Sequence, residues 1–221
     1  MLVDSTTFQE IPRHFLPSRQ HYHYVRVKLA TDPLYSAVAA ALADTTAPLL
    51  DLGCGIGLLA HCCRARGLLL DYRGVDNDVA KIRLACQAAE HGRLSNARFE
   101  TMDLSQQFPE HQGSVAILDL LQYLPADRAG GFLASAAGCV TETARLIIRT
   151  GLQDGSWRAH VTRAADLLAW AIRWTNSAPR KYPNREFLRT HLTALGLEPV
   201  FTPLSGNTPF NNWLIVSRRV R

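Results

Sequence analysis

A glycine-rich stretch, Asp51-Leu52-Gly53-Cys54-Gly55-Ile56-Gly57, ends the apolar run that begins at Pro48. Glycine has no β-carbon, so the backbone of such a turn can approach a bound ligand closely. A strand that ends in a glycine turn before a helix is typical of sites for adenosine cofactors. The dinucleotide fingerprint would need glycine where Leu58 stands, and no lysine follows Gly57 as in a P-loop. The spacing therefore favours an adenosine cofactor over a cradled phosphate chain.

Two acids follow the loop at spacings that suit an adenosine ligand. Asp76 comes 19 residues after Gly57, at the end of a second expected strand. This is close to the offset of about 20 residues at which an acid accepts hydrogen bonds from ribose hydroxyls. Asp103 follows a third expected strand, where its carboxylate could accept from an exocyclic amine. Met102 beside it offers a polarizable apolar surface for the ring.

Together these motifs resemble the class I S-adenosylmethionine-dependent methyltransferases, over residues from about 30 to 221. The stretch 49–57 is similar to the first motif of that family, and Gly74-Val75-Asp76 to its ribose-binding acid. Met102-Asp103 resembles its adenine-binding pair, and 117–124 the segment that lines the methionine moiety. The resemblance implies S-adenosylmethionine as cofactor, bound by these residues: Asp51, Gly53, Cys54, Gly55, Gly57, Asp76, Asn77, Met102, Asp103, Leu104, Asp119 and Leu120.

The elements that must position these residues alternate along the chain. Strands are expected at 48–52, 72–76, 97–100, 114–118 and 144–149, with helices at 33–43, 58–66, 79–91 and 127–140. This alternation predicts an α/β fold, a parallel sheet with helices on both faces. A helix at 185–195 precedes strands at 197–203 and 212–217, whose short connection makes them antiparallel. The resemblance implies a Rossmann-like, doubly wound, seven-stranded sheet of order 3-2-1-4-5-7-6, in a single methyltransferase domain over 1–221.

The segment His21–Leu29 gathers aromatic rings, imidazoles and cations ahead of the expected helix at 33–43. Tyr24 and Lys28 are four apart and could share one helix face, from which they could grip the carboxylate of the cofactor. His21 or His23 could serve as the base near neutral pH, and Tyr24 is a further catalytic candidate. Residues 1–30 would then form a lid. The alternative is an amphipathic helix with surface histidines.

Residues 152–184 form an expected cap insert, in which Trp170 and Trp174 share a helix face. That face could roof an aromatic substrate, or it could be ordinary core packing. No N-P-P-Y-like tetrapeptide follows the fourth strand, which disfavours methylation of DNA or of a protein amide. We therefore expect O-methylation of an aromatic or carboxylate-bearing small molecule. Lys28 and Asp32-Pro33-Leu34-Tyr35 also resemble small methyltransferases of bacterial aryl-polyene pigment pathways, which would imply a free or carrier-bound aryl acceptor.

Composition sets the remaining expectations. The chain has 221 residues with a net charge of +5, and its basic residues are dispersed rather than clustered as in a nucleic-acid-binding tail. The sequence shows neither a secretory signal nor a membrane-spanning run, so a cytoplasmic protein is expected. The five cysteines lack metal-ligand spacing, and no metal site is expected. An NAD(P)-dependent oxidoreductase, an RNA methyltransferase and a non-catalytic S-adenosylmethionine-binding protein remain alternatives, and the oligomeric state is open.

Overall fold

The computed structural model describes residues 7–171, 180–204 and 208–220. The seven strands follow the order β3-β2-β1-β4-β5-β7-β6, which confirms the expected topology. The chain divides into two compact units, Met1–His111 and Gln112–Arg221. Within the described residues, no helix is both long enough and apolar enough to cross a membrane.

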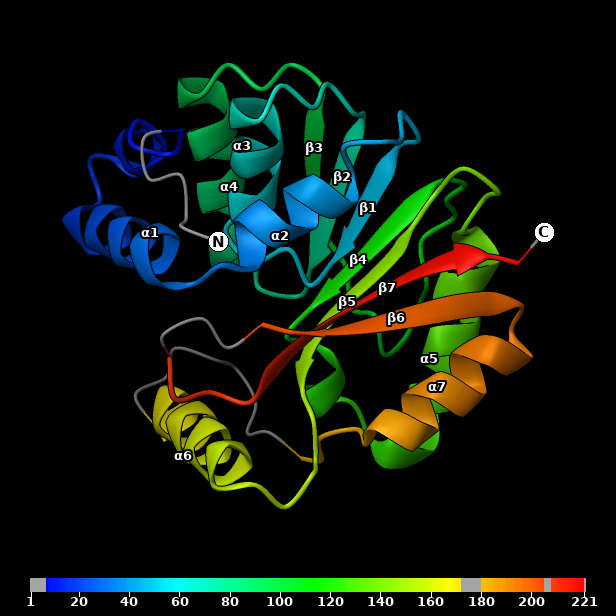
Figure 1. Ribbon diagram of the computed structural model, residues 1–221. Coiled ribbons are helices and arrows are strands. Elements are labelled where there is room, and N and C mark those ends of the chain that lie inside the picture. Colours follow the sequence, from blue (N-terminus) through cyan, green and yellow to red (C-terminus); the bar gives the residue numbers. More distant parts are fainter. Residues whose placement is uncertain (1–6, 172–179, 205–207, 221) are drawn as a thin grey trace. The chain divides into compact units, whose positions relative to one another are not determined.

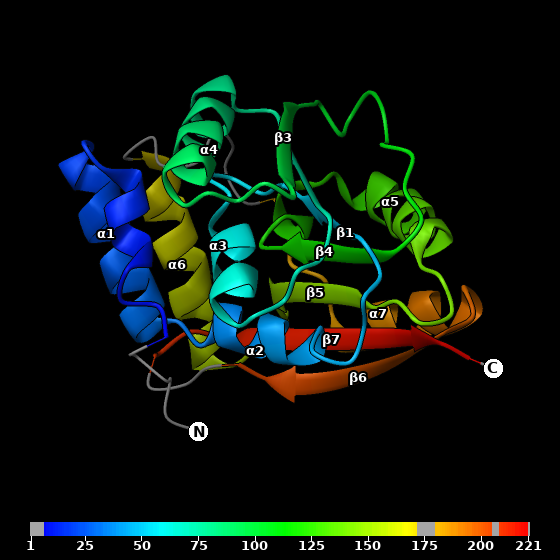
Figure 2. The ribbon, with the colours of Figure 1, turned by 90° about the horizontal axis from the view of Figure 1, so that it is seen from above.

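The first unit places three parallel strands beside a layer of helices. Its strands pair in parallel, β1 with β2 and β2 with β3. Helices α3 and α4 lie along one face of these strands, α2 packs beside α3, and α1 lies on their outer side (Figures 1 and 2). The elements in chain order are η1 (Ile11–Phe15), α1 (Arg19–Thr31), α2 (Leu34–Ala41), β1 (Leu49–Leu52), α3 (Leu58–Ala65), β2 (Tyr72–Asp76), α4 (Val79–His91) and β3 (Ala97–Thr101).

The N-terminal segment is more ordered than its sequence indicates. Residues up to about 20 read as irregular, yet η1 forms there and packs against α1 and α4. Phe8, Ile11 and Phe15 are buried in one cluster with Val25 of α1 and Leu58 of α3. Pro12 falls at the start of η1, where its missing N–H costs no hydrogen bond. These apolar residues are too few to show a helical period in the sequence. Their side chains are nevertheless buried and pack this segment against α3.

The second unit holds the antiparallel end of the sheet. Strand β4 pairs in parallel with β5, and β7 runs antiparallel to both β5 and β6. Helices α5 and α7 pack on each other and over this sheet, while α6 follows the carboxyl end of β5 (Figure 1). The elements are β4 (Ser114–Leu118), η2 (Leu121–Tyr123), α5 (Ala126–Cys139), β5 (Leu146–Gly151), α6 (Trp157–Ala171), α7 (Arg185–Ala194), β6 (Leu197–Pro203) and β7 (Asn212–Arg219).

Strand β6 is an edge strand protected by prolines. Val220 donates its N–H to Gly196, and Leu204 donates to Asn212. Hydrogen-bonded pairs alternate along an antiparallel ladder, so the even-numbered residues of β6 bond to β7 and the odd-numbered ones face outward. Pro199 and Pro203 occupy two of these outward positions and offer no N–H. The edge is thus a poor template for another strand.

Residues 152–184, the expected cap insert, contain α6. Asn211 anchors the start of this segment, since its side-chain amide donates to the carbonyl of Leu152 at 2.7 Å and to Asp154 at 3.0 Å. The backbone N–H of Asn211 donates to Thr162 of α6 at 2.8 Å. Of the expected Trp170–Trp174 face, Trp174 and the side chain of Trp170 lie outside the described part of the chain.

Candidate cofactor site

The glycine loop joins β1 to α3 with three residues in the left-handed region. Gly53, Gly55 and Gly57 have φ angles of 79°, 56° and 75°, which non-glycine residues adopt only with strain. The N–H groups of Gly53 and Cys54 both donate to the carbonyl of Val75, at 2.8 and 3.0 Å. The loop therefore turns back over the end of β2, and its glycines are required by the backbone itself.

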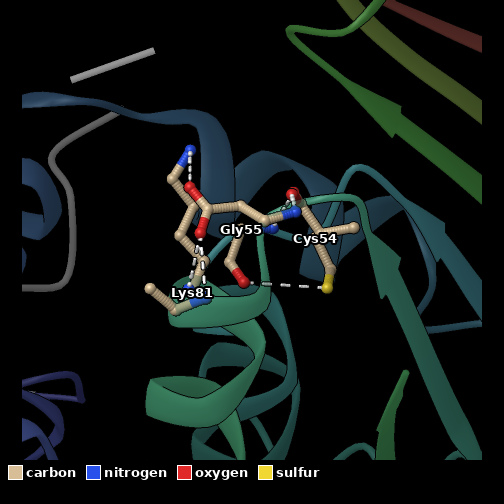
Figure 3. Close-up of polar contacts among 6 residues, drawn as sticks. Cys54, Gly55 and Lys81 are labelled. Carbon is tan, nitrogen blue, oxygen red and sulfur yellow. Dashed lines mark hydrogen bonds and ion pairs between the residues drawn. The ribbon is translucent and has the colours of Figure 1, made fainter. Parts of the chain in front are cut away.

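Asp76 closes this loop from the end of β2. Its Oδ2 accepts the N–H of Gly55 at 2.9 Å, and its Oδ1 accepts the N–H of Asp78 at 2.9 Å. Asp78 in turn caps α4 by accepting from Ala80 and Lys81. Figure 3 shows Gly55 beside this first turn of α4, with the Cys54 thiol directed at the carbonyl of Gly55. Each carboxylate oxygen has a second lone pair, so Asp76 can still accept from a ligand.

The space on the two sides of the loop differs. A β-carbon on Gly57 would lie 2.6 Å from the Phe99 ring, and one on Gly74 would lie 2.8 Å from Cys54 Sγ. A β-carbon on Gly55 would meet no described atom within 4 Å. Gly57 and Gly74 therefore serve close packing of the loop against β2 and β3. Gly55 borders open space, where a ligand could approach the backbone.

Asp51 lies beneath the loop and is 2% exposed. The Tyr72 hydroxyl donates to its Oδ2, while its Oδ1 has no hydrogen-bond partner among the described residues. Burial raises the pKa of Asp51 to about 7, the hydrogen bond from Tyr72 opposes that rise, and the charge of Asp76 adds to it. An orphaned, buried carboxyl oxygen at the end of β1 fits a ligand that brings a donor or a positive charge.

At the end of β3, Met102 and Asp103 continue the same carboxyl edge. The N–H of Met102 donates to the backbone carbonyl of Asp76 at 2.9 Å, which fixes the turn after β3 beside the end of β2. Asp103 accepts from the N–H of Ser105 at 2.9 Å and from the Gln106 amide at 3.0 Å. These hydrogen bonds, those from Ser105 first, lower the pKa of Asp103. Its carboxylate stays ionised at neutral pH and is exposed enough to accept from a ligand.

Helix α1 carries the expected lid residues on a partly buried face. Tyr24 and Lys28 are both half-buried, and Tyr24 packs against the buried N-terminal cluster. Lys28 forms an ion pair with Asp32 at 2.7 Å, a contact that the sequence reading did not include. The i, i+4 spacing of this pair is itself a signal that could have predicted it.

The two candidate bases differ in their surroundings. Ser18 caps α1 and its Oγ lies 2.7 Å from His21 Nδ1. Burial lowers the pKa of His21, so its imidazole is neutral at pH 7. His23 is exposed, and its ring lies edge-on to Tyr22 with the centroids 5.1 Å apart. His21 therefore has the environment of a neutral base, and His23 has that of a surface side chain.

In the second unit, Asp119 and Leu120 follow the carboxyl end of β4. Asp119 adopts a φ of 59° and forms an ion pair with Arg149 of β5. Its N–H donates to the carbonyl of Arg149 at 2.9 Å. Leu120 is half-buried and leads into η2. Asp119 is thus held by a buried arginine that the sequence reading did not pair with it.

Several partners of the site residues lie too far apart in the chain for the sequence reading to find. Tyr72 lies on β2, next to the strand that carries Asp51, and donates to Asp51. The Phe99 ring of β3 packs against the loop at Gly57. Parallel pairing sets Asp51 opposite Gly74, which places Tyr72 on the same face of the sheet as Asp51. That register, once assumed, would have indicated Tyr72 as the partner of Asp51.

Comparison with known proteins gives one curated relative of note. No protein-family model matches the chain. A ubiquinone biosynthesis O-methyltransferase from Idiomarina loihiensis is 27% identical over 167 residues, which is 72% of this chain and 67% of that protein. The aligned part thus leaves about a third of the relative unmatched.

Solved structures resemble nearly the whole chain. An O-methyltransferase family protein from Burkholderia thailandensis has a TM-score of 0.70 at 19% identity, over 96% of this chain and 63% of that chain. The chain thus spans less than two thirds of that protein. Magnesium protoporphyrin IX methyltransferase from Synechocystis, solved with bound SAH, has a TM-score of 0.67 at 20% identity, over 98% and 95%. The fold is that of S-adenosylmethionine-dependent methyltransferases.

Proposed function

We propose that this protein transfers the methyl group of S-adenosylmethionine to an oxygen atom of a small molecule. The observation that carries the proposal is the Gly55–Asp76 contact, in which a left-handed glycine and a strand-end acid meet at 2.9 Å beside open space. In this arrangement the loop backbone can approach an adenosyl group, and both Asp76 oxygens can accept from vicinal ribose hydroxyls. The relative from Idiomarina loihiensis, named for an O-methyltransferase activity, supports oxygen as the nucleophile.

In this proposal the chain binds and orients the two reactants. S-adenosylmethionine supplies an activated methyl group, so transfer needs alignment and exclusion of water more than strong acid–base catalysis. Asp76 and Asp103 hold the ribose and adenine ends, and Asp51 offers its unpartnered oxygen beneath the loop. Asn77 and Leu104, next to these acids, complete the set of proposed contacts at the carboxyl edge.

The lid and the cap complete the proposed single domain. Residues 1–30 contain Tyr24 and Lys28. In this proposal the Lys28 ammonium leaves its ion pair with Asp32 and pairs with the carboxylate of the cofactor. His21 is the better placed of the two histidines to accept a proton from the acceptor, because burial keeps its imidazole neutral. In the second unit, Asp119 and Leu120 line the methionine moiety. Residues 152–184 cover the acceptor.

The proposed acceptor is an aromatic or carboxylate-bearing small molecule, free or attached to a carrier. The resemblance of Asp32-Pro33-Leu34-Tyr35 to aryl-polyene pathway enzymes points to an aryl group. The test incubates the protein with S-adenosylmethionine labelled in its methyl group and a panel of mono- and dihydroxybenzoates, cinnamates and aliphatic hydroxy acids. Labelled products with methyl on oxygen are expected, and Asp76→Ala should abolish them. Binding of S-adenosylmethionine without transfer to any member of the panel would contradict the proposal.

A further inference from the structure

Gln122 is a buried polar residue that the proposed cofactor site does not use. It lies in η2, directly after the carboxyl end of β4, and the residue is only 3% exposed. Its Oε1 has no hydrogen-bond partner among the described residues. An amide oxygen that is buried without a donor destabilises the protein, because it loses its water and gains nothing. Such an atom in a folded protein calls for an explanation.

The backbone around Gln122 is held in place by residues 180–183, a segment that we call the strap. The carbonyl of Gln122 accepts the N–H of Arg180 at 2.8 Å. The Tyr182 ring lies against Gly151 at the end of β5, where a β-carbon would come within 3.0 Å of it. Pro183 accepts the N–H of Gln153 at 3.0 Å. The strap therefore crosses the carboxyl ends of β4 and β5 and fixes η2 there.

This position is where the fold places ligands. In open α/β sheets, ligands bind outside the carboxyl ends of the strands, and Gln122 follows β4 at that edge. A side chain that merely filled space beneath the strap would be apolar, like its neighbour Leu121, which is also buried. The amide thus provides an acceptor at the ligand edge, with its own backbone already fixed.

We propose that Oε1 of Gln122 accepts a hydrogen bond from a hydroxyl group of the methyl acceptor. The inference rests on the proposed function and narrows its substrate class to molecules that carry a hydroxyl group at the acceptor site. An amide oxygen accepts a hydrogen bond but does not take up a proton near neutral pH. It therefore binds and orients an O–H group.

Substitution of Gln122 by methionine gives two readouts. Gln122→Met keeps the length of the side chain and removes the acceptor. With S-adenosylhomocysteine present, catechol (1,2-dihydroxybenzene) should bind this variant at least about tenfold more weakly than the wild type, because sites built to bond a hydroxyl depend strongly on that bond. 1,2-Dimethoxybenzene, which has no O–H, should bind both proteins equally. Gln112→Met, an exposed position in the same unit and outside residues 152–184, is the matched control and should change neither affinity.

The second readout needs no acceptor. Because the orphaned oxygen destabilises the ligand-free protein, Gln122→Met should raise the Tm by about 2–4 °C, while Gln112→Met should leave it unchanged. A lower Tm in Gln122→Met would show that the buried amide stabilises the ligand-free protein, and would overturn the inference. Failure of catechol to bind the wild type would also overturn it.

A methyl-transfer assay distinguishes failure of this inference from failure of the proposed function on which it rests. If catechol binding depends on Gln122 but no labelled methyl group reaches any acceptor, the proposed activity fails and the hydroxyl-binding role stands. If hydroxylated acceptors are methylated with the same kcat/KM by Gln122→Met and the wild type, the activity stands and the role of Gln122 is overturned. A rise in KM with little change in kcat is the expected result, since the bond is made to the bound ground state as well.

Discussion

Oδ2 of Asp76 accepts the backbone N–H of Gly55 at 2.9 Å, so the loop after β1 and the acid at the end of β2 form one hydrogen-bonded unit. The carboxylate therefore has two roles. It fixes the left-handed conformation of Gly55, and it remains able to accept from a ligand. A change at either residue should affect cofactor binding through both roles, although the consequences for the fold differ.

Gly55→Ala should abolish binding of S-adenosylhomocysteine and cost little stability. A β-carbon at position 55 meets no described atom, so the cost to the fold is the strain of a φ of 56°, about 1–2 kcal/mol. The same β-carbon would stand in the space through which a ligand reaches the loop. Calorimetric titration and urea unfolding measure the two effects separately.

Gly67→Ala is the matched control for that variant. Gly67 ends α3 with a φ of 76°, and a β-carbon there also meets no described atom. The two variants should lose similar stability, but only Gly55→Ala should lose ligand binding. Wild-type affinity in Gly55→Ala would show that no ligand approaches the backbone at this residue.

Gly57→Ala should destabilise the protein more than either of those variants. Its β-carbon would lie 2.6 Å from the Phe99 ring and 3.1 Å from Ala85, so the ring must move or the loop must shift. Strain and overpacking together should lower the free energy of unfolding by about 2–4 kcal/mol. Adding Phe99→Leu should restore part of this loss if the ring is the obstacle. Equal stability of Gly57→Ala and Gly67→Ala would contradict the packing described for the loop.

Asp51 should make the protein less stable as the pH rises from about 4 to 7. Burial raises its pKa from 3.8 to about 7, so the folded state keeps a proton that the unfolded state has lost in this range. The free energy of unfolding should fall by up to about 1.4 kcal/mol per pH unit in that window and level off above it. Asp51→Asn, which can still accept from Tyr72, should remove this dependence. An unchanged slope in urea unfolding between pH 5 and 7 would refute the assignment.

His61 should make the stability of the protein depend on pH in the opposite direction to Asp51. It is buried in α3, with His14 Nδ1 at 3.0 Å from its own Nδ1, and burial followed by the charge of His14 lowers its pKa from 6.5 to about 3. The folded state therefore stays neutral at His61 while the unfolded state takes up a proton. Stability should be lost as the pH falls from 6.5 towards 3.

His61→Gln should flatten this acid limb, with His160→Gln, an exposed change on α6, as the control. Thermal unfolding between pH 4 and 7 measures the effect. If wild type and His61→Gln lost stability in parallel on acidification, the buried neutral histidine would be excluded.

The strands and helices could be predicted where a local pattern sets them. The bounds of β2, β4, β6 and α4 agree with the sequence reading. Local signals mark these bounds, since β2 ends at an acid, an acid follows β4, β6 ends at a proline, and Asp78 marks the start of α4. Strand β5 lies two residues later than expected, from Leu146 to Gly151. Arg145, which precedes it, is buried and donates to the carbonyls of Thr143 and Ala144. The Arg145 side chain thus provides hydrogen-bond donors for the carbonyls of the turn before β5. The apolar run in the sequence does not indicate that these residues belong to a turn.

The pairings within the site could not be predicted in the same way. The contact of Asp119 with Arg149 joins the residue that follows β4 to a residue of β5, 30 positions away, and depends on the register of β4 with β5. The Asp51–Tyr72 pair depends likewise on the register of β1 with β2. Spacing along the chain indicated which residue types stand at the carboxyl edge. Only the assembled sheet shows which of them neutralise or orient each other.

Calorimetric titration with S-adenosylhomocysteine tests the central claim most directly. The wild type should bind it and should not bind NAD, while Asp76→Ala should show no measurable binding and keep a cooperative unfolding transition. Asp78→Ala, two residues away, removes the cap of α4 and should lose about 1 kcal/mol of stability but retain the ligand. Wild-type affinity in Asp76→Ala, or a wild type that binds NAD instead, would contradict the account.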